Sequence, residues 1–137
     1  MSDHWNWSNR LRIPSDTSAT SEAIEPLLAR MQTDAWDDRD VFGVHLAVEE
    51  ALVNAIKHGN GECAEKSVAI EYRTSDDCVQ IEIADEGRGF DPHAVPDPTS
   101  AEHIDQPNGR GILIMRTYMS RVEYNAVGNA VLLEKCR

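Results

Sequence analysis

The sequence predicts a single α/β domain, because segments with the periodicity of strands alternate with segments that have the periodicity of amphipathic helices. The chain has 137 residues, of which 41% are hydrophobic, so it can bury one substantial core and has no room for a second domain. We therefore expect residues 1–137 to form one unit. The formal net charge of -11 argues against nucleic-acid or membrane partners, since an acidic surface repels phosphate groups.

Strand patterns occur near the start, in the middle and at the end of the chain. Apolar and polar side chains alternate over residues 5–13, which indicates a first strand. Residues 67–74 and 78–85 are two β-like runs joined by a short polar turn, so they predict a hairpin. Residues 121–136 resemble a second hairpin that turns near Gly128 and Asn129.

Three segments have helical periodicity. Residues 23–31 form an amphipathic pattern after several possible N-caps. A second helix begins near Asp40 and ends in the letters HGNG, where Gly59 or Gly61 can adopt the left-handed conformation of a C-cap. A third follows from residue 112, after a segment rich in proline and glycine that we expect to be a long loop.

The three cysteines predict neither a disulfide framework nor a zinc cluster. Cys63, Cys78 and Cys136 are odd in number and lack a C-x-x-C spacing, so a reducing, cytoplasmic environment fits best. The first residues lack the basic and apolar parts of a signal peptide. No apolar run approaches the ~20 residues that span a bilayer.

The second helix carries polar side chains opposite its expected core face. Residues placed about 100° apart put Val44 and Val48 on one apolar stripe, with Glu50, Asn54 and Lys57 roughly opposite. Glu50 and Asn54 are i, i+4 neighbours, so a carboxylate and an amide can reach the same small volume. Taken alone, this pattern is more typical of a solvated helix face.

The letters DEGRG follow directly after the second strand of the first hairpin. Asp85 shares the parity of Ile83, so the apolar face of this strand would end in a carboxylate, which needs hydrogen-bond donors when buried. The amino group of a planar base would serve, and Gly87 and Gly89 would let the backbone pass close to that base. The alternative is a turn in which Asp85 caps local amides.

The letters GRG at residues 109–111 lie where the long loop enters the third helix. Unpaired amides at a helix N-terminus bind anions, and glycines let a phosphate approach, although a loop hinge is the simpler explanation of this pair alone. The Walker pattern G-x-x-x-x-G-K-[ST] is absent. The three motifs together, a polar helix face, a base-reading carboxylate and a glycine pair for phosphates, describe a nucleotide pocket.

These motifs resemble the N box and the two glycine boxes of the GHKL superfamily, which includes gyrase, heat-shock chaperone and histidine-kinase ATPase domains. In chain order they are Glu50-x-x-x-Asn54, Asp85-x-Gly87-x-Gly89 and Gly109-x-Gly111. The wording EEALVNAIKHG and the ending GNAVLLEK look most like the stand-alone anti-sigma factor serine kinases. The resemblance covers most of the chain, roughly from the first strand to the last.

The resemblance implies a two-layer α/β sandwich, with helices on one face of a mixed, mainly antiparallel sheet. It implies ATP and ADP as ligands together with Mg2+, which Asn54 would hold. Asp85 would accept a hydrogen bond from the adenine amino group, and Glu50 would be the general base for transfer of the γ-phosphoryl group. Residues 87–108 would form a mobile ATP lid. The other nucleotide-binding residues would be Gly87, Arg88, Gly89, Gly109, Arg110, Gly111 and Asn129.

The function implied by the resemblance is that of an ATP-dependent serine-protein kinase, expected as a homodimer. Such a kinase phosphorylates a STAS-type anti-sigma-factor antagonist and sequesters a sigma factor. Relatives often carry a threonine after the glycine of the last hairpin, whereas this chain has Gly128-Asn129-Ala130. That departure motivates an alternative, a nucleotide-gated protein-binding module without efficient phosphoryl transfer. A detached histidine-kinase ATPase domain ranks third, because no helices with a phospho-accepting histidine precede the motifs.

Overall fold

The computed structural model describes residues 5–61, 63, 65–87 and 107–137, without the side chains of 107–112. The strands are β1 (Trp7–Pro14), β2 (Ser67–Thr74), β3 (Cys78–Ala84), β4 (Arg121–Tyr124) and β5 (Ala130–Cys136). The α-helices are α1 (Thr20–Thr33), α2 (Asp38–Asn54) and α3 (Pro107–Tyr118), and two shorter helices are η1 (Thr17–Ala19) and η2 (Ala55–Gly59). None of the helices in these ranges has the length and apolar character needed to cross a membrane.

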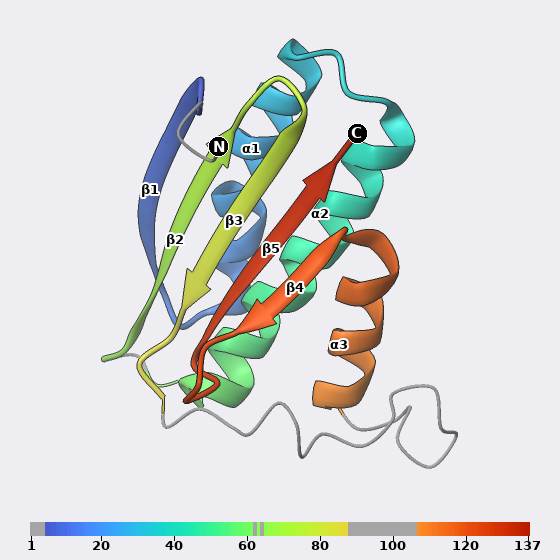
Figure 1. Ribbon diagram of the computed structural model, residues 1–137. Helices are drawn as coiled ribbons and strands as arrows, with labels where there is room; N and C mark the ends of the chain where they lie inside the picture. Colours follow the sequence, from blue (N-terminus) through green and yellow to red (C-terminus); the bar gives the residue numbers. More distant parts are fainter. Residues whose placement is uncertain (1–4, 62, 64, 88–106) are drawn as a thin grey trace.

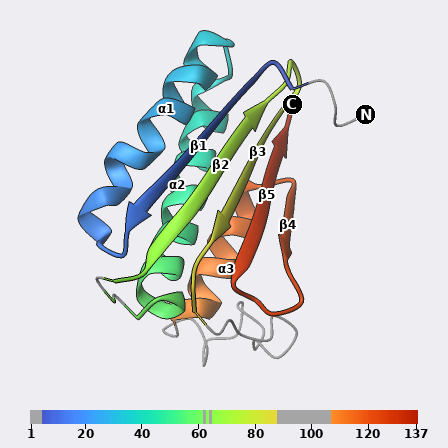
Figure 2. The same ribbon diagram turned by 90° about the vertical axis from the view of Figure 1, so that its left-hand side faces the viewer.

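The strands form one five-stranded sheet in the order β1-β2-β3-β5-β4, with all three α-helices on one of its faces (Figures 1 and 2). The predicted α/β sandwich is therefore confirmed, and so are both predicted hairpins. Every strand pairing in the described part of the chain is antiparallel, although the resemblance implies a mixed sheet. The third helix begins at Pro107 and thus earlier than the pattern of apolar residues indicates.

The core lies between the inner face of the sheet and the helices. In β2, Val68, Ile70 and Tyr72 are buried against the helices, whereas the alternate residues Glu71 and Arg73 face the other way. Full burial of one large apolar side chain stabilises the fold by roughly 1.5–3 kcal/mol. Alternation along the strand therefore fixes which face of the sheet meets the helices.

Helix α2 buries the predicted stripe and then changes its winding. Val44, Val48 and Leu52 are fully buried, which confirms the expected core face. After Asn54 the helix continues as the π-helix η2, a feature that is often found at functional sites. The residue in the left-handed conformation that ends the helix is Gly61, with φ 61°. Gly59 does not have a positive φ, so its backbone conformation does not require a glycine.

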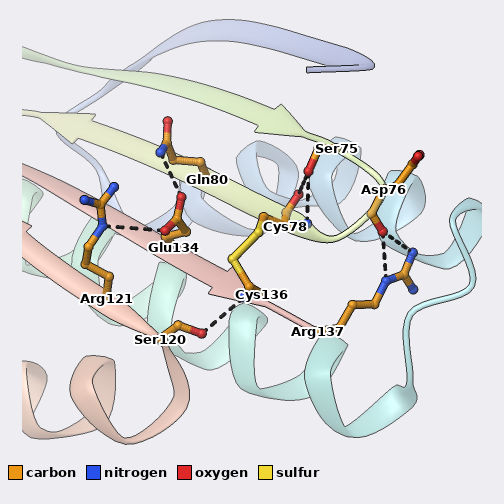
Figure 3. Close-up of a disulfide and its surroundings, with 9 residues drawn as sticks. All are labelled: Ser75, Asp76, Cys78, Gln80, Ser120, Arg121, Glu134, Cys136 and Arg137. Atoms are coloured by element: carbon orange, nitrogen blue, oxygen red, sulfur yellow. Dashed lines mark hydrogen bonds and ion pairs between the residues drawn. A yellow bond between two sulfur atoms is a disulfide. The ribbon is translucent and has the colours of Figure 1, made fainter. Parts of the chain in front are cut away.

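Cys78 and Cys136 form a disulfide (Figure 3). The two cysteines are direct cross-strand partners in β3 and β5, with their Cα atoms 4.1 Å apart, and Cys63 is free. The expectation that the cysteines form no disulfide is therefore wrong. The partners are 58 residues apart in sequence, and only the pairing of β3 with β5 brings them together.

Arg137 lies beside the disulfide and bonds to the backbone of two other segments (Figure 3). Its guanidinium donates hydrogen bonds of 2.8 and 3.0 Å to the Asp76 carbonyl oxygen and one of 3.0 Å to the Asp34 carbonyl oxygen. The same group lies 4.4 Å from the centre of the Trp36 ring, within the range of a cation–π interaction. The last residue thus joins the β2–β3 turn to the connection between α1 and α2.

Candidate functional site

The segments that carry the predicted site residues meet at the end of the sheet opposite the disulfide. In Figures 1 and 2, the end of α2, the end of β3, the β4–β5 turn and the start of α3 lie at this end. The fold therefore brings together residues that are distant in sequence, as the nucleotide-pocket hypothesis requires.

Asp85 lies where β3 ends and is held by two backbone contacts. Its N–H donates to the Asn129 carbonyl oxygen at 2.9 Å, and its Oδ1 accepts a hydrogen bond of 2.7 Å from the N–H of Gly87. The buried residues Ile81 and Ile83 precede it on the same face. The predicted placement of a carboxylate at the end of the apolar face of this strand is therefore confirmed.

Gly59 and Gly87 pack so closely around Asp85 that neither position has room for a side chain. A Cβ atom added to Gly59 would overlap the Asp85 carboxylate and would lie only 2.7 Å from its Oδ1. A Cβ atom added to Gly87 would overlap the Gly59 carbonyl group and would lie 2.9 Å from the same Oδ1. The end of the long helix and the turn after β3 therefore form one close-packed unit.

Burial raises the pKa of Asp85 above its ordinary value. The hydrogen bond from the Gly87 N–H and the charge of Lys66 lower it, but burial is the largest effect. Burial also raises the pKa of Tyr124, at the end of β4, to about 12; the charge of Asp85 adds to this shift, and Arg116 opposes it. Among the described residues, the Gly87 N–H is the one hydrogen-bond donor to the Asp85 carboxylate.

Glu50 and Asn54 lie on α2, and both side chains are half-buried. Neither forms a hydrogen bond or ion pair with any residue in the described part of the chain. Glu49 differs, because it is exposed and lies 3.4 Å from the His45 imidazole in an i, i+4 pair. Of the two neighbouring carboxylates, Glu50 is therefore the one without a partner among the described residues.

Asn129 faces the turn that carries Gly87. Its Nδ2 donates to the Gly87 carbonyl oxygen at 3.3 Å, and its Oδ1 accepts a hydrogen bond of 2.8 Å from Asn125. The Oδ1 of Asn125 in turn accepts from three backbone amides of the β4–β5 turn, including that of Gly128 at 2.7 Å. The side chain of Asn129 is thus already engaged within the protein.

Gly109, Arg110 and Gly111 are the third to fifth residues of α3, so they lie within the helix and not in the loop before it. The first amides of a helix have no partner inside it and can bind phosphate. Of the three residues, Gly109 lies among these first amides, whereas the N–H groups of Arg110 and Gly111 come after them. Arg88 and Gly89 lie outside the described residues, and so does the proposed lid of residues 87–108 except at its two ends.

Three residues of this end of the sheet were not predicted from the sequence to belong to a site. Gly59 and Asn60 belong to the letters HGNG, which were interpreted only as a helix end, and Tyr124 lies in a strand of mixed polarity. Asn60 has a relative exposure of only 3%, which is unusual for an amide. A polar residue between two glycines was the one signal that this segment is more than a cap.

A hollow of about 500 Å³ lies on the outer face of the sheet. It is lined by residues of β1, β2, β3 and β5, including Arg10, Glu71 and Ala130. Since α2 covers the opposite face, this hollow is separated by the sheet from Glu50 and Asn54. It is not the predicted nucleotide site.

The donor set on α2 suits a magnesium ion that is held mainly by a nucleotide. No group of three or more His, Cys, Asp or Glu side chains in the described ranges is arranged to hold a metal. Mg2+ usually keeps several waters and takes one or two protein ligands beside the oxygens of the substrate phosphates. The unengaged amide oxygen of Asn54 fits that role.

Residues 13–135 match the family of histidine kinase-like ATPase domains. This match spans most of the chain, so the protein belongs to that family, and the resemblance to the GHKL superfamily is confirmed. Membership of an ATPase family implies a site for ATP and ADP.

Individual relatives carry kinase and anti-sigma factor names. The chain is 31% identical over 119 residues to the serine/threonine-protein kinase BtrW of Bordetella bronchiseptica, a match that covers 85% of this chain and 84% of the relative. It is 33% identical over 89 residues to the serine-protein kinase RsbW of Bacillus licheniformis, covering 61% and 56%. It is 31% identical over 101 residues to an anti-sigma F factor of Clostridium beijerinckii, covering 70% and 71%.

Proposed function

We propose that the protein is an ATP-dependent serine-protein kinase that also acts as an anti-sigma factor. Its substrate would be the serine of a STAS-type anti-sigma-factor antagonist, and its second partner a sigma factor. The observation that carries the proposal is the half-buried, unpaired Glu50 one helical turn from Asn54, on the helix whose end packs against Asp85. The names of the relatives support the same activity.

In the proposed reaction each residue has a separate role. Asp85 accepts a hydrogen bond from the adenine amino group, and the first amides of α3 donate to the phosphates. Glu50 takes the proton from the serine hydroxyl as that oxygen attacks the γ-phosphorus and the bond to the β-phosphate oxygen breaks. Asn54 would hold Mg2+, which when bound neutralises the charge that develops on the phosphate oxygens.

The alternative function is a nucleotide-gated binding module without efficient phosphoryl transfer. Asn129 follows Gly128, where relatives often have a threonine after the glycine, and its amide forms hydrogen bonds with Gly87 and Asn125. The Asn129 amide can therefore take the place of the threonine hydroxyl near the phosphates only if these two hydrogen bonds break. Pull-down of a partner that responds to nucleotide, without phosphate appearing on that partner, would favour this function.

The proposal also includes a homodimer and a cytoplasmic location. Cytosolic disulfides in most organisms are transient or redox-sensing, so the Cys78–Cys136 pair would be open to reduction there. Nucleotide binding and phosphate transfer are therefore best measured with both the oxidised and the reduced protein.

The first test is calorimetric binding of ADP and ATP with magnesium to the wild type and to Asp85→Asn. The variant replaces the charged acceptor by a neutral amide and loses ~1.5–3 kcal/mol, so affinity should fall by about 10- to 100-fold. Glu82→Gln, an exposed change on the same strand, is the matched control and should bind normally. A wild type that binds neither nucleotide would remove both functions.

Nucleotide affinity should also depend on pH through Asp85. The ionised carboxylate accepts this hydrogen bond more strongly than the protonated carboxyl group does, and the pKa of Asp85 in the free protein is raised. We therefore expect affinity to be full above this raised pKa and to fall as the pH drops through it, at a higher pH than for an ordinary aspartate. ADP titrations of the wild type and Asp85→Asn at several pH values separate this effect from protonation of the phosphates, and equal pH profiles would contradict it.

A further inference from the structure

Asn60 joins four segments of the chain behind the Asp85 turn. Its side chain is buried, and its Nδ2 donates at 2.9 Å both to the Ser15 hydroxyl and to the Ser67 carbonyl oxygen. Its Oδ1 accepts a hydrogen bond of 2.7 Å from the N–H of Glu86. One amide thus connects the end of η2 to the segment after β1, to the start of β2 and to the turn after β3.

The bond to the Glu86 N–H acts directly on the peptide unit that carries Asp85. On the other side of Glu86, the Gly87 N–H holds the Asp85 carboxylate at 2.7 Å. The Glu86 side chain turns back to β2 and accepts from the Ser67 N–H at 2.6 Å and from its hydroxyl at 3.1 Å. Asp85 therefore begins a turn, and the next residue, Glu86, is held by hydrogen bonds of both its backbone and its side chain.

Gly59, next to Asn60, confines the same carboxylate from the helix side. A Cβ atom at this position would overlap the Asp85 carboxylate, so the backbone of η2 packs directly against the turn that carries Asp85. Asn60 fixes the distance between the end of η2 and this turn, because it follows η2 directly and accepts a hydrogen bond from the Glu86 N–H.

We propose that Asn60 is a positioning residue for the nucleotide site, which holds the Asp85 turn against Gly59 so that the carboxylate is in place to accept from the base. This inference rests on the proposed function, because it assigns Asp85 to the base. Asn60 touches neither the base nor the phosphates in this role and acts through Asp85 alone.

The test uses Asn60→Ala in the full chain, with two measurements. ADP affinity with magnesium should fall about tenfold, because the turn loses one buried hydrogen bond and the carboxylate its fixed position. Hydrogen exchange of the Gly87 amide, followed by NMR without nucleotide, should become about tenfold faster, because its bond to Asp85 is no longer held. Unchanged exchange of the Gly87 amide would overturn the proposal.

Gln80→Ala is the matched control for the loss of a buried amide. Gln80 has a relative exposure of 8% and bonds to Arg73 at 2.6 Å and to Glu134 at 3.1 Å, on β3 but away from the Asp85 turn. Its replacement should leave ADP affinity and Gly87 exchange as in the wild type. An equal loss of affinity in this variant would show that general destabilisation is responsible and would overturn the proposal.

Two further variants distinguish positioning from a contribution to stability. Asn60→Asp keeps an oxygen for the Glu86 N–H but loses the donor to the Ser67 carbonyl oxygen, so Gly87 exchange should lie between that of the wild type and that of Asn60→Ala. Exchange as fast as in Asn60→Ala would contradict the proposal. Asn60→Ala should weaken ADP binding much less in the Asp85→Asn background than in the wild type, because both changes act on one contact. Additive losses would contradict the proposal as well.

The outcomes also separate this inference from the proposed function. If the wild type binds no nucleotide, the proposed function fails, while Gly87 exchange still decides whether Asn60 holds the turn. If Asn60→Ala does not fold, Gly59→Ala tests the same arrangement from the helix side, because its Cβ displaces Asp85 directly. Normal ADP affinity and normal Gly87 exchange in that folded variant would overturn the proposal.

Discussion

Replacement of Glu50 by alanine is expected to slow transfer of phosphate to a partner serine by about 10²- to 10⁴-fold, the contribution of a general base. ADP affinity should remain nearly unchanged, because Glu50 takes part in the reaction and not in recognition of the base. The two quantities are measured by transfer of labelled phosphate from ATP to a STAS-type antagonist and by calorimetry with ADP. A loss of transfer with intact binding would establish the role of Glu50.

Glu49→Ala provides the control for this experiment. It removes the neighbouring carboxylate, which is exposed and pairs with His45 outside the site, so transfer should stay at the wild-type rate. If Glu50→Ala transfers phosphate as fast as the wild type, or if Glu49→Ala is the inactive variant, the assignment of the base is wrong. If the wild type itself transfers no phosphate but binds ATP, the binding-module alternative is the better description.

Removal of the Cys78–Cys136 disulfide is expected to lower the free energy of unfolding by about 4 kcal/mol, the loop-entropy value for a closed loop of this size. The bridge spans 58 residues and constrains the unfolded chain over that length. Urea unfolding of the oxidised protein, the reduced protein and Cys78→Ser gives the difference. Cys63→Ser, which removes the free thiol, should leave stability unchanged, and equal stability of the oxidised and reduced forms would contradict the prediction.

Much of the fold was predictable because hydrophobic periodicity is local. The stripe through Val44, Val48 and Leu52 identified the buried face of α2, and the alternation around Ile70 and Tyr72 identified a strand with one buried face. The disulfide was not predictable, because the pairing of β3 with β5 is a tertiary contact that no spacing between cysteines reveals.

The residues proposed to carry the chemistry were easier to predict from the sequence than the residues that hold them in place. Asp85 was found because a carboxylate at the end of an apolar strand is unusual, and Glu50 because it shares a helix face with Asn54. Asn60 and Gly59 were not found, since their importance lies in contacts with Glu86 and with the Asp85 carboxylate. Such contacts join residues that are 26 positions apart in sequence, and they form only when the turn after β3 meets the helix end.

The disulfide divides the residues of the proposed site between two topologically different parts of the chain. Residues 78–136 form a covalent ring that contains Asp85, α3 and Asn129, whereas Glu50 and Asn54 lie on the linear part that precedes it. A protease cut at any one bond inside the ring leaves a single oxidised molecule, and the same cut in the reduced protein gives two separate fragments. Comparison of nicked samples on reducing and non-reducing gels therefore reports the redox state of the molecule that was actually assayed.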